Sequence, residues 1–236
     1  FMDASSEALH RISGKRIPRW NAQMPKGLGR IKARPVNEGN PLKVVYFPSC
    51  IARNMGPARG DDVRPLPEVT VRVLQKAGYE VIFPKGMDGL CCGQAFESKG
   101  FVAQADAKSA ELEEALLAAT RDGELPVLCD TSPCLKRMKD VLDPRLKFLD
   151  PSVFVLEHLQ DRLTFTRKDK TVALHVTCTA RKMGLDGKLL ELAGKCAAKV
   201  VVPEDIFCCG FAGDKGFTTP ELNASALKTL ADKVRD

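Results

Sequence analysis

Nine cysteines give the chain its most distinctive chemistry. Four of them form two adjacent pairs, Cys91-Cys92 and Cys208-Cys209, and a glycine follows each pair. Adjacent cysteines do not readily form a disulfide with each other, because the small ring that results strains the peptide between them. Soft-metal ligation is a better explanation, since two neighbouring thiolates on a turn can reach different atoms of a polynuclear cluster. A single zinc ion would usually prefer wider spacing.

The chain is an internal duplication. Residues 43–56 match residues 171–184, with a valine, a cysteine, an alanine, an arginine, a methionine and a glycine in register. Residues 88–95 match residues 205–212 in the same way, around the two Cys-Cys-Gly runs. The lone cysteines that recur are Cys50 and Cys178. Repetition in register argues against buried structural thiols and favours metal ligands in both halves.

The first half contains two further cysteines, Cys129 and Cys134. Cys134 is a candidate ligand, whereas Cys129 is either an additional ligand or the inward residue that ends a buried strand. Cys196 has no counterpart in the other half, and we expect it to fill the core. His175 lies three residues before Cys178, where a core or supporting role is expected rather than direct ligation.

Apolar runs alternate with longer amphipathic segments in both halves, which predicts an α/β fold with parallel sheets. The expected strands are 43–47, 79–83, 126–129, 171–176 and 198–202. The expected helices are 66–77, 101–121, 150–159, 188–196 and 220–234. This pattern predicts two pseudo-symmetric repeats with the cysteine loops at the carboxyl ends of the strands, where open α/β sheets bind ligands.

From about residue 43 onward the sequence resembles the Cys-Cys-Gly domain family, found in heterodisulfide reductase, in glycolate and lactate oxidation iron-sulfur subunits, and in anaerobic glycerol-3-phosphate dehydrogenase. The family pattern falls on Cys50, Cys91, Cys92 and Cys134, and again on Cys178, Cys208 and Cys209. Two departures stand out: four residues separate Cys129 from Cys134 instead of two, and the second repeat reaches Asp236 before its last cysteine. We therefore expect the second repeat to be truncated.

This resemblance implies an iron-sulfur cluster of the 4Fe-4S type, although other members of the family bind zinc. The run 9–21 and Met24-Pro25-Lys26 also resemble the segment before this domain in bacterial D-lactate dehydrogenases that fuse flavin, ferredoxin-like and Cys-Cys-Gly domains. The resemblance implies the electron-transfer region of a flavin-dependent 2-hydroxy acid dehydrogenase acting on D-lactate. FAD would lie elsewhere in the parent polypeptide, and a quinone or cytochrome would accept the electrons.

Two other functions fit the residues. One is a zinc-stabilised interaction module, with a closed four-sulfur site formed by Cys50, Cys91, Cys92 and Cys134. The other is a thiol-disulfide enzyme that uses Cys91 and Cys92 as a reactive pair. Neither a dinucleotide fingerprint nor a P-loop follows any expected strand, so we expect no nucleotide site in the chain.

Positive charge is concentrated in the leader. Residues 1–34 contain eight Lys/Arg and two acidic residues, an excess of six that equals the net charge of the chain. The expected organisation is a basic linker at 1–41, a first repeat at 42–161 and a second repeat at 162–236. No sequence feature indicates nucleic-acid binding. We expect a cytoplasmic protein, with peripheral association at the inner face of the membrane as an option for the basic leader.

Overall fold

The computed structural model describes residues 2–14, 16–17, 20, 24–29, 31, 37–58, 60, 63–213 and 215–234. The first half forms a four-stranded sheet in the order β2-β1-β3-β4, and every neighbouring pair is parallel. Its strands are β1 (Lys43–Phe47), β2 (Glu80–Ile82), β3 (Val127–Cys129) and β4 (Phe148–Leu149). The first three confirm the predicted strands to within one residue at each end, whereas the short β4 was not predicted.

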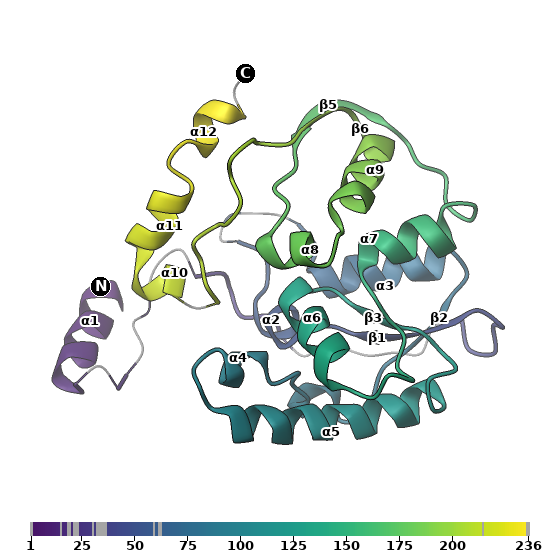
Figure 1. Cartoon of the computed structure of the whole chain (residues 1–236), viewed down its shortest axis with the longest axis horizontal. Coiled ribbons are helices and arrows are strands. Elements are labelled where there is room, and N and C mark those ends of the chain that lie inside the picture. Colours follow the sequence, from purple (N-terminus) through teal and green to yellow (C-terminus); the bar gives the residue numbers. More distant parts are fainter. Residues whose placement is uncertain are drawn as a thin grey trace.

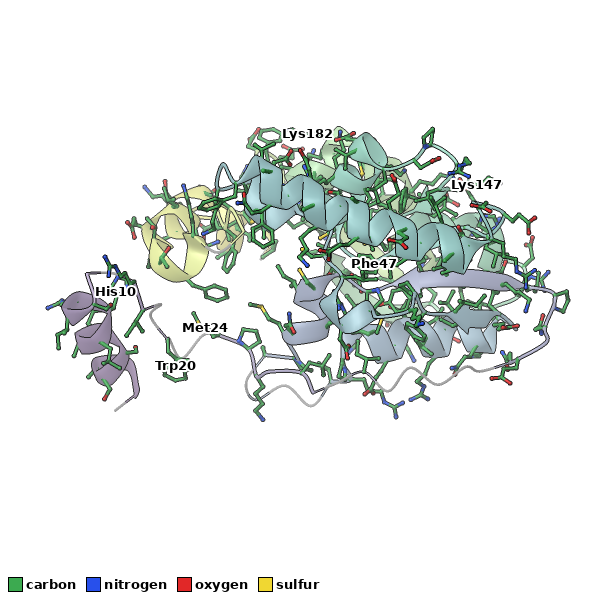
Figure 2. All side chains as sticks on the ribbon, turned by 90° about the horizontal axis from the view of Figure 1, so that it is seen from below. His10, Trp20, Met24, Phe47, Lys147 and Lys182 are labelled. Carbon is green, nitrogen blue, oxygen red and sulfur yellow. The ribbon has the colours of Figure 1, made fainter. Side chains whose placement is uncertain are left out.

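The central strands are buried on both faces, which explains their continuous apolar sequence. In β1, Val45 and Phe47 pack against Leu112 and Leu116 of helix α5 (Val102–Thr120). On the other face, Val44 and Tyr46 of β1 belong to a second core. That core also contains Leu74 of helix α3 (Leu66–Lys76). Figure 1 shows the sheet between α5 below and α3 behind, and Figure 2 shows Phe47 inside the molecule.

Short elements complete the first half. They are α2 (Cys50–Asn54), the 3-10 turn η1 (Met87–Gly89), α4 (Gln94–Glu97), α6 (Ser132–Val141), α7 (Pro151–Phe154) and the π-helical turn η2 (Val155–Leu159). The predicted connecting helix over 150–159 is confirmed as α7 and η2 together. The Asp150 side chain caps it by accepting a hydrogen bond from the Ser152 amide at 2.8 Å.

The second half has a smaller sheet, in which β5 (Lys168–Ala173) pairs in parallel with β6 (Ala197–Val201). The prediction placed the first of these strands at 171–176, three residues too late. The error has a physical cause: β5 is exposed along its whole length, and it begins with polar residues, of which Lys168 and Thr171 pair with β6 although no apolar pattern marks them. The parallel α/β architecture is confirmed in both halves.

The described residues of the second half form the helices α8 (Cys178–Lys182), α9 (Asp186–Cys196), α10 (Lys215–Thr218), α11 (Pro220–Ala226) and α12 (Leu230–Lys233). The single helix predicted over 220–234 is wrong, because it is broken at Leu227, where φ is −107°. Neither α11 nor α12 contains a buried residue, so little packing holds them in one straight helix. The three last helices lie together at the left in Figure 1.

The leader is more ordered than a simple linker. It begins with α1 (Met2–Ile12), which was not predicted and which lies at the edge of the molecule in both views. Farther on, Leu28 donates its amide to the Asn54 carbonyl at 3.0 Å, and Gly56 donates to the Lys26 carbonyl at 2.7 Å. These bonds attach the leader to the end of α2. None of the described helices is long and apolar enough to cross a membrane.

Candidate metal centre

Parallel strands with neighbouring carboxyl ends bring the cysteines of the first half together. Cys50 opens α2 directly after the central strand β1, and Cys91-Cys92 follow β2 by way of η1. Cys134 lies in the first turn of α6, which follows β3. Since β2 and β3 flank β1, all these loops meet at one edge of the sheet, as the sequence predicted.

The four thiols lie close enough to shift one another's pKa. The largest influence on the pKa of Cys50 is Cys91, the largest on that of Cys91 is Cys50, followed by Cys92, and the largest on that of Cys92 is Cys134. Interaction with Cys50 and then with Cys92 lowers the pKa of Cys91 to about 2, whereas interaction with Cys91 raises the pKa of Cys50 and interaction with Cys134 raises that of Cys92. The lowered pKa favours a thiolate at Cys91, and the thiolate is the form of cysteine that binds a metal.

A tight turn presents the Cys91-Cys92 pair. Gly93 has a φ of +84°, and its amide donates to the Cys91 sulfur at 3.4 Å. A Cβ at Gly93 would lie 2.4 Å from the Ala105 carbonyl oxygen, so α5 runs too close to the turn for any side chain. Glycine is required here both for its backbone conformation and for its size.

Arg53 holds the backbone before the pair. It lies one helical turn after Cys50, is only 7% exposed, and its guanidinium donates to the carbonyls of Pro48, Met87 and Leu90. The Leu90 carbonyl belongs to the peptide that leads into Cys91. Arg53 therefore joins the Cys50 helix to the Cys91 loop.

Arg137 holds the backbone after the pair. It lies one turn after Cys134, is 3% exposed, and donates from Nε to the Cys92 carbonyl at 2.9 Å. Its other nitrogens contact Glu97 and Asp106 at 2.5 and 3.1 Å. Neither arginine was given a role from the sequence. The signal that could have found them is Cys-x-x-Arg, which occurs after Cys50, Cys134 and Cys178.

A polar network supports the loops beside Cys50. Asp130 accepts hydrogen bonds from the Tyr46 hydroxyl at 2.7 Å and from the Ser49 amide at 3.0 Å. The hydroxyls of Ser49 and Thr131 lie 2.7 Å apart, and Ser49 caps α2. Burial, followed by the charge of Asp130, raises the pKa of Tyr46. The strand ends of β1 and β3 are thus fixed to each other next to the thiols.

Two other cysteines have contrasting positions. Cys129 is fully buried in the core with Cys92 and Cys134, and burial raises its pKa well above the ordinary value. Cys129 therefore remains a candidate for an additional ligand. Cys196, expected in the core, is exposed at the end of α9, so that prediction was wrong. The C-terminal turn of α9 lies at the surface, and helical spacing alone did not show which face it buries.

The second half repeats the Cys-Cys-Gly turn of the first half. Gly210 donates its amide to the Cys208 sulfur at 3.3 Å, and a Cβ at Gly210 would lie 2.4 Å from the Leu222 carbonyl oxygen. Cys178 and Cys208 are exposed and Cys209 is half-buried. Within the described residues, no interaction links Cys178 to either member of the pair.

Two side chains near the second lone cysteine are informative. Arg181 donates from Nε to the Val176 carbonyl at 3.2 Å and lies over the ring of Phe207, 5.4 Å from its centre, so it spans from α8 toward the Cys208 loop as Arg53 does in the first half. Both ring nitrogens of His175 are buried without a hydrogen-bond partner.

The two halves touch where their cysteine loops begin. The hydroxyl of Ser132, in the first turn of α6, lies 3.3 Å from that of Thr177, which precedes Cys178. Helices α6 and α8 are in contact, and Met183 packs against the first core. Two centres held by these halves would therefore be neighbours.

Comparison with known proteins matches this arrangement to a family. The sequence model of the cysteine-rich domain, abbreviated CCG, matches residues 44–137 and again 172–235. The chain belongs to the CCG family. Both matches contain the lone cysteine and the Cys-Cys-Gly turn of a repeat, so the family match confirms the resemblance read from the sequence.

Curated CCG relatives have names that refer to lactate. The chain is 25% identical over 214 residues to "Lactate utilization protein A 1" of Bacillus mycoides (strain KBAB4), covering 83% of the chain and 81% of the relative. It is 26% identical over 186 residues to "Lactate utilization protein A" of Oceanobacillus iheyensis, covering 71% and 72%. The likeness extends over most of each protein.

The cysteines of the first CCG repeat are suited to binding a metal ion or an iron-sulfur cluster. In the described part of the chain, no three Cys, His, Asp or Glu side chains are placed to hold one ion together. A polynuclear cluster does not need that geometry, because its cysteines bind different iron atoms. Four neighbouring thiols, one stabilised as thiolate, supply suitable soft donors for such a cluster.

Proposed function

We propose that the chain is the iron-sulfur electron-transfer region of a lactate-oxidising system. The observation that carries this proposal is the convergence of four thiols that shift one another's pKa, from Cys50, Cys91, Cys92 and Cys134, at one edge of the sheet in a CCG repeat. The names of the lactate utilization relatives support the substrate class. A 4Fe-4S cluster bound there would accept and release single electrons.

The residues around the thiols suit that task. Cys92 and Cys134 are buried, which excludes water from one side of the site, whereas Cys50 and Cys91 are half-exposed. Phe96 of α4 and Phe101, which caps α5, are exposed and follow the pair in sequence, so they could meet a partner domain. The site therefore has a dry inner side and an accessible outer side, as electron transfer between domains requires.

We further propose that D-lactate is oxidised at an FAD held by another domain of the same polypeptide, together with a ferredoxin-like domain, and that a quinone or cytochrome receives the electrons. The chain would supply binding and electrostatic tuning. A cytoplasmic location is proposed, with the basic leader able to contact the inner face of the membrane. We propose that the chain has three parts: a basic leader at 1–41, a first repeat at 42–161 and a second repeat at 162–236. Cys178, Cys208 and Cys209 would contribute to a second centre.

Iron and acid-labile sulfide analysis after anaerobic reconstitution tests the proposal. We expect both elements in the wild-type chain, and a loss of at least half of each in Cys92→Ser. The matched control is Cys196→Ser, an exposed cysteine outside the site, which should retain wild-type contents. Zinc without sulfide would instead support the structural module, and rapid reversible oxidation of Cys91 with Cys92 in a metal-free active form would support thiol-disulfide chemistry. Either result would reject the electron-transfer function.

A further inference from the structure

Two buried arginines hold the peptide groups on either side of the Cys91-Cys92 pair. Arg53 donates to the Leu90 carbonyl at 2.5 Å, just before the pair, and Arg137 donates to the Cys92 carbonyl, at its end, at 2.9 Å. Each arginine lies one helical turn after a candidate ligand, Cys50 or Cys134. Both guanidinium groups are therefore close to the thiols as well as to the turn that presents them.

The two arginines differ in their charge environment. All the hydrogen bonds of Arg53 that the structure shows go to backbone carbonyls, and in the described part of the chain no carboxylate lies within salt-bridge distance of it. Arg137 forms ion pairs with Glu97 and Asp106, whose side chains are 45% and 66% exposed. Among the described residues, Arg53 therefore has no carboxylate partner and its buried charge acts on the thiols, whereas the charge of Arg137 is balanced by two carboxylates.

A buried cation that has no carboxylate partner has a predictable effect on the reduction potential of a nearby redox centre. Adding an electron makes the centre more negative, and a nearby positive charge in a low-dielectric interior stabilises that state. Removing the cation should make reduction of the centre harder. Removing the carboxylates that are paired with a second cation beside the same site should make reduction easier.

We propose that Arg53 is a positioning residue that raises the reduction potential of the centre at Cys50, Cys91, Cys92 and Cys134, and that Glu97 and Asp106 limit the same effect of Arg137. The proposal rests on the proposed function. Arg53 and Arg137 together fix the turn, but only Arg53 acts on the potential through its net charge. The charge balance at Arg137 can be changed by substitution, because both of its carboxylate partners lie at the surface.

The test is an EPR-monitored redox titration of the anaerobically reconstituted full chain. In Arg53→Gln we expect a negative shift of at least ~59 mV, the value of a tenfold change in a one-electron equilibrium constant. Arg53→Lys keeps the charge but cannot hold three carbonyls, and its potential should stay near that of the wild type. A merely structural role would shift both variants alike, and that result would overturn the proposal.

A second variant keeps the test decisive if Arg53→Gln does not fold. The double variant Glu97→Gln/Asp106→Asn changes only exposed side chains and uncovers the charge of Arg137, so its potential should shift in the positive direction. Arg145→Gln removes a 53% exposed charge from the turn before β4, at the opposite edge of the sheet, and should leave the potential unchanged. An unchanged potential in the double variant would contradict the inference. Failure of the wild-type chain to take up iron and sulfide would instead reject the proposed function.

Discussion

Replacing Gly93 by alanine should destabilise the chain for two separable reasons. A φ of +84° is unfavourable for alanine and costs about 1–2 kcal/mol. In addition, the new Cβ would lie 2.4 Å from the Ala105 carbonyl oxygen, which is backbone of α5 and cannot rotate away. Overpacking of this kind costs about 1–3 kcal/mol, so the total loss in free energy of unfolding should be about 2–5 kcal/mol.

Gly100 provides a matched control for the first of these costs. Its φ is also +84°, but nothing lies within 4 Å of the position that a Cβ would take. Gly100→Ala should therefore cost only the backbone term of about 1–2 kcal/mol. Urea denaturation followed by circular dichroism measures both variants. If Gly93→Ala is no more destabilising than Gly100→Ala, the close approach of α5 to the cysteine turn is refuted.

Further predictions concern the polar network, a surface carboxyl and the core. Tyr46→Phe removes the hydroxyl that donates to Asp130 at 2.7 Å and should lower the free energy of unfolding by about 1–3 kcal/mol in urea denaturation. An unchanged free energy of unfolding would show that this hydrogen bond to Asp130 does not stabilise the Cys50 loop. The hydrogen bonds from Arg145 lower the pKa of Asp143 to about 2, from an ordinary 3.8, so Asp143 should titrate near pH 2 by NMR and its pKa should rise toward 3.8 in Arg145→Gln. Because the folded pKa is depressed, the stability that Asp143 contributes is present above about pH 3.8 and is lost as the pH falls through about 2; an ordinary titration in the wild-type chain would contradict this. Leu112→Ala, at a fully buried position against β1, should cost about 2–5 kcal/mol by chemical denaturation, and a cost below about 1 kcal/mol would show that α5 does not cover the sheet as described.

The first half could be predicted well from sequence because its strands are buried on both faces. Continuous apolar runs mark β1 and β3, and the parallel order then places their following loops at one edge. The second half gave a weaker signal, since β5 is exposed and polar residues take part in its pairing. A two-residue strand such as β4 is too short for any periodicity.

The cysteines could be predicted as a group, but their supporting residues could not. Repetition in register selected the lone cysteines and the pairs without any knowledge of the fold. The role of Arg53 depends on carbonyls 34 and 37 residues away along the chain, at Met87 and Leu90, and no local pattern indicates such contacts. The difference in burial between Cys92, which is buried, and its counterpart Cys209, which is half-buried, also depends on packing, because both stand in the same local motif.

Anomalous diffraction at the iron absorption edge, from crystals grown anaerobically after reconstitution, would locate the metal directly. The account predicts strong iron peaks within bonding distance of the sulfur atoms of Cys50, Cys91, Cys92 and Cys134, with bridging sulfide between the iron atoms. Loaded crystals in which iron binds elsewhere, or in which these four sulfur atoms hold no iron, would contradict it.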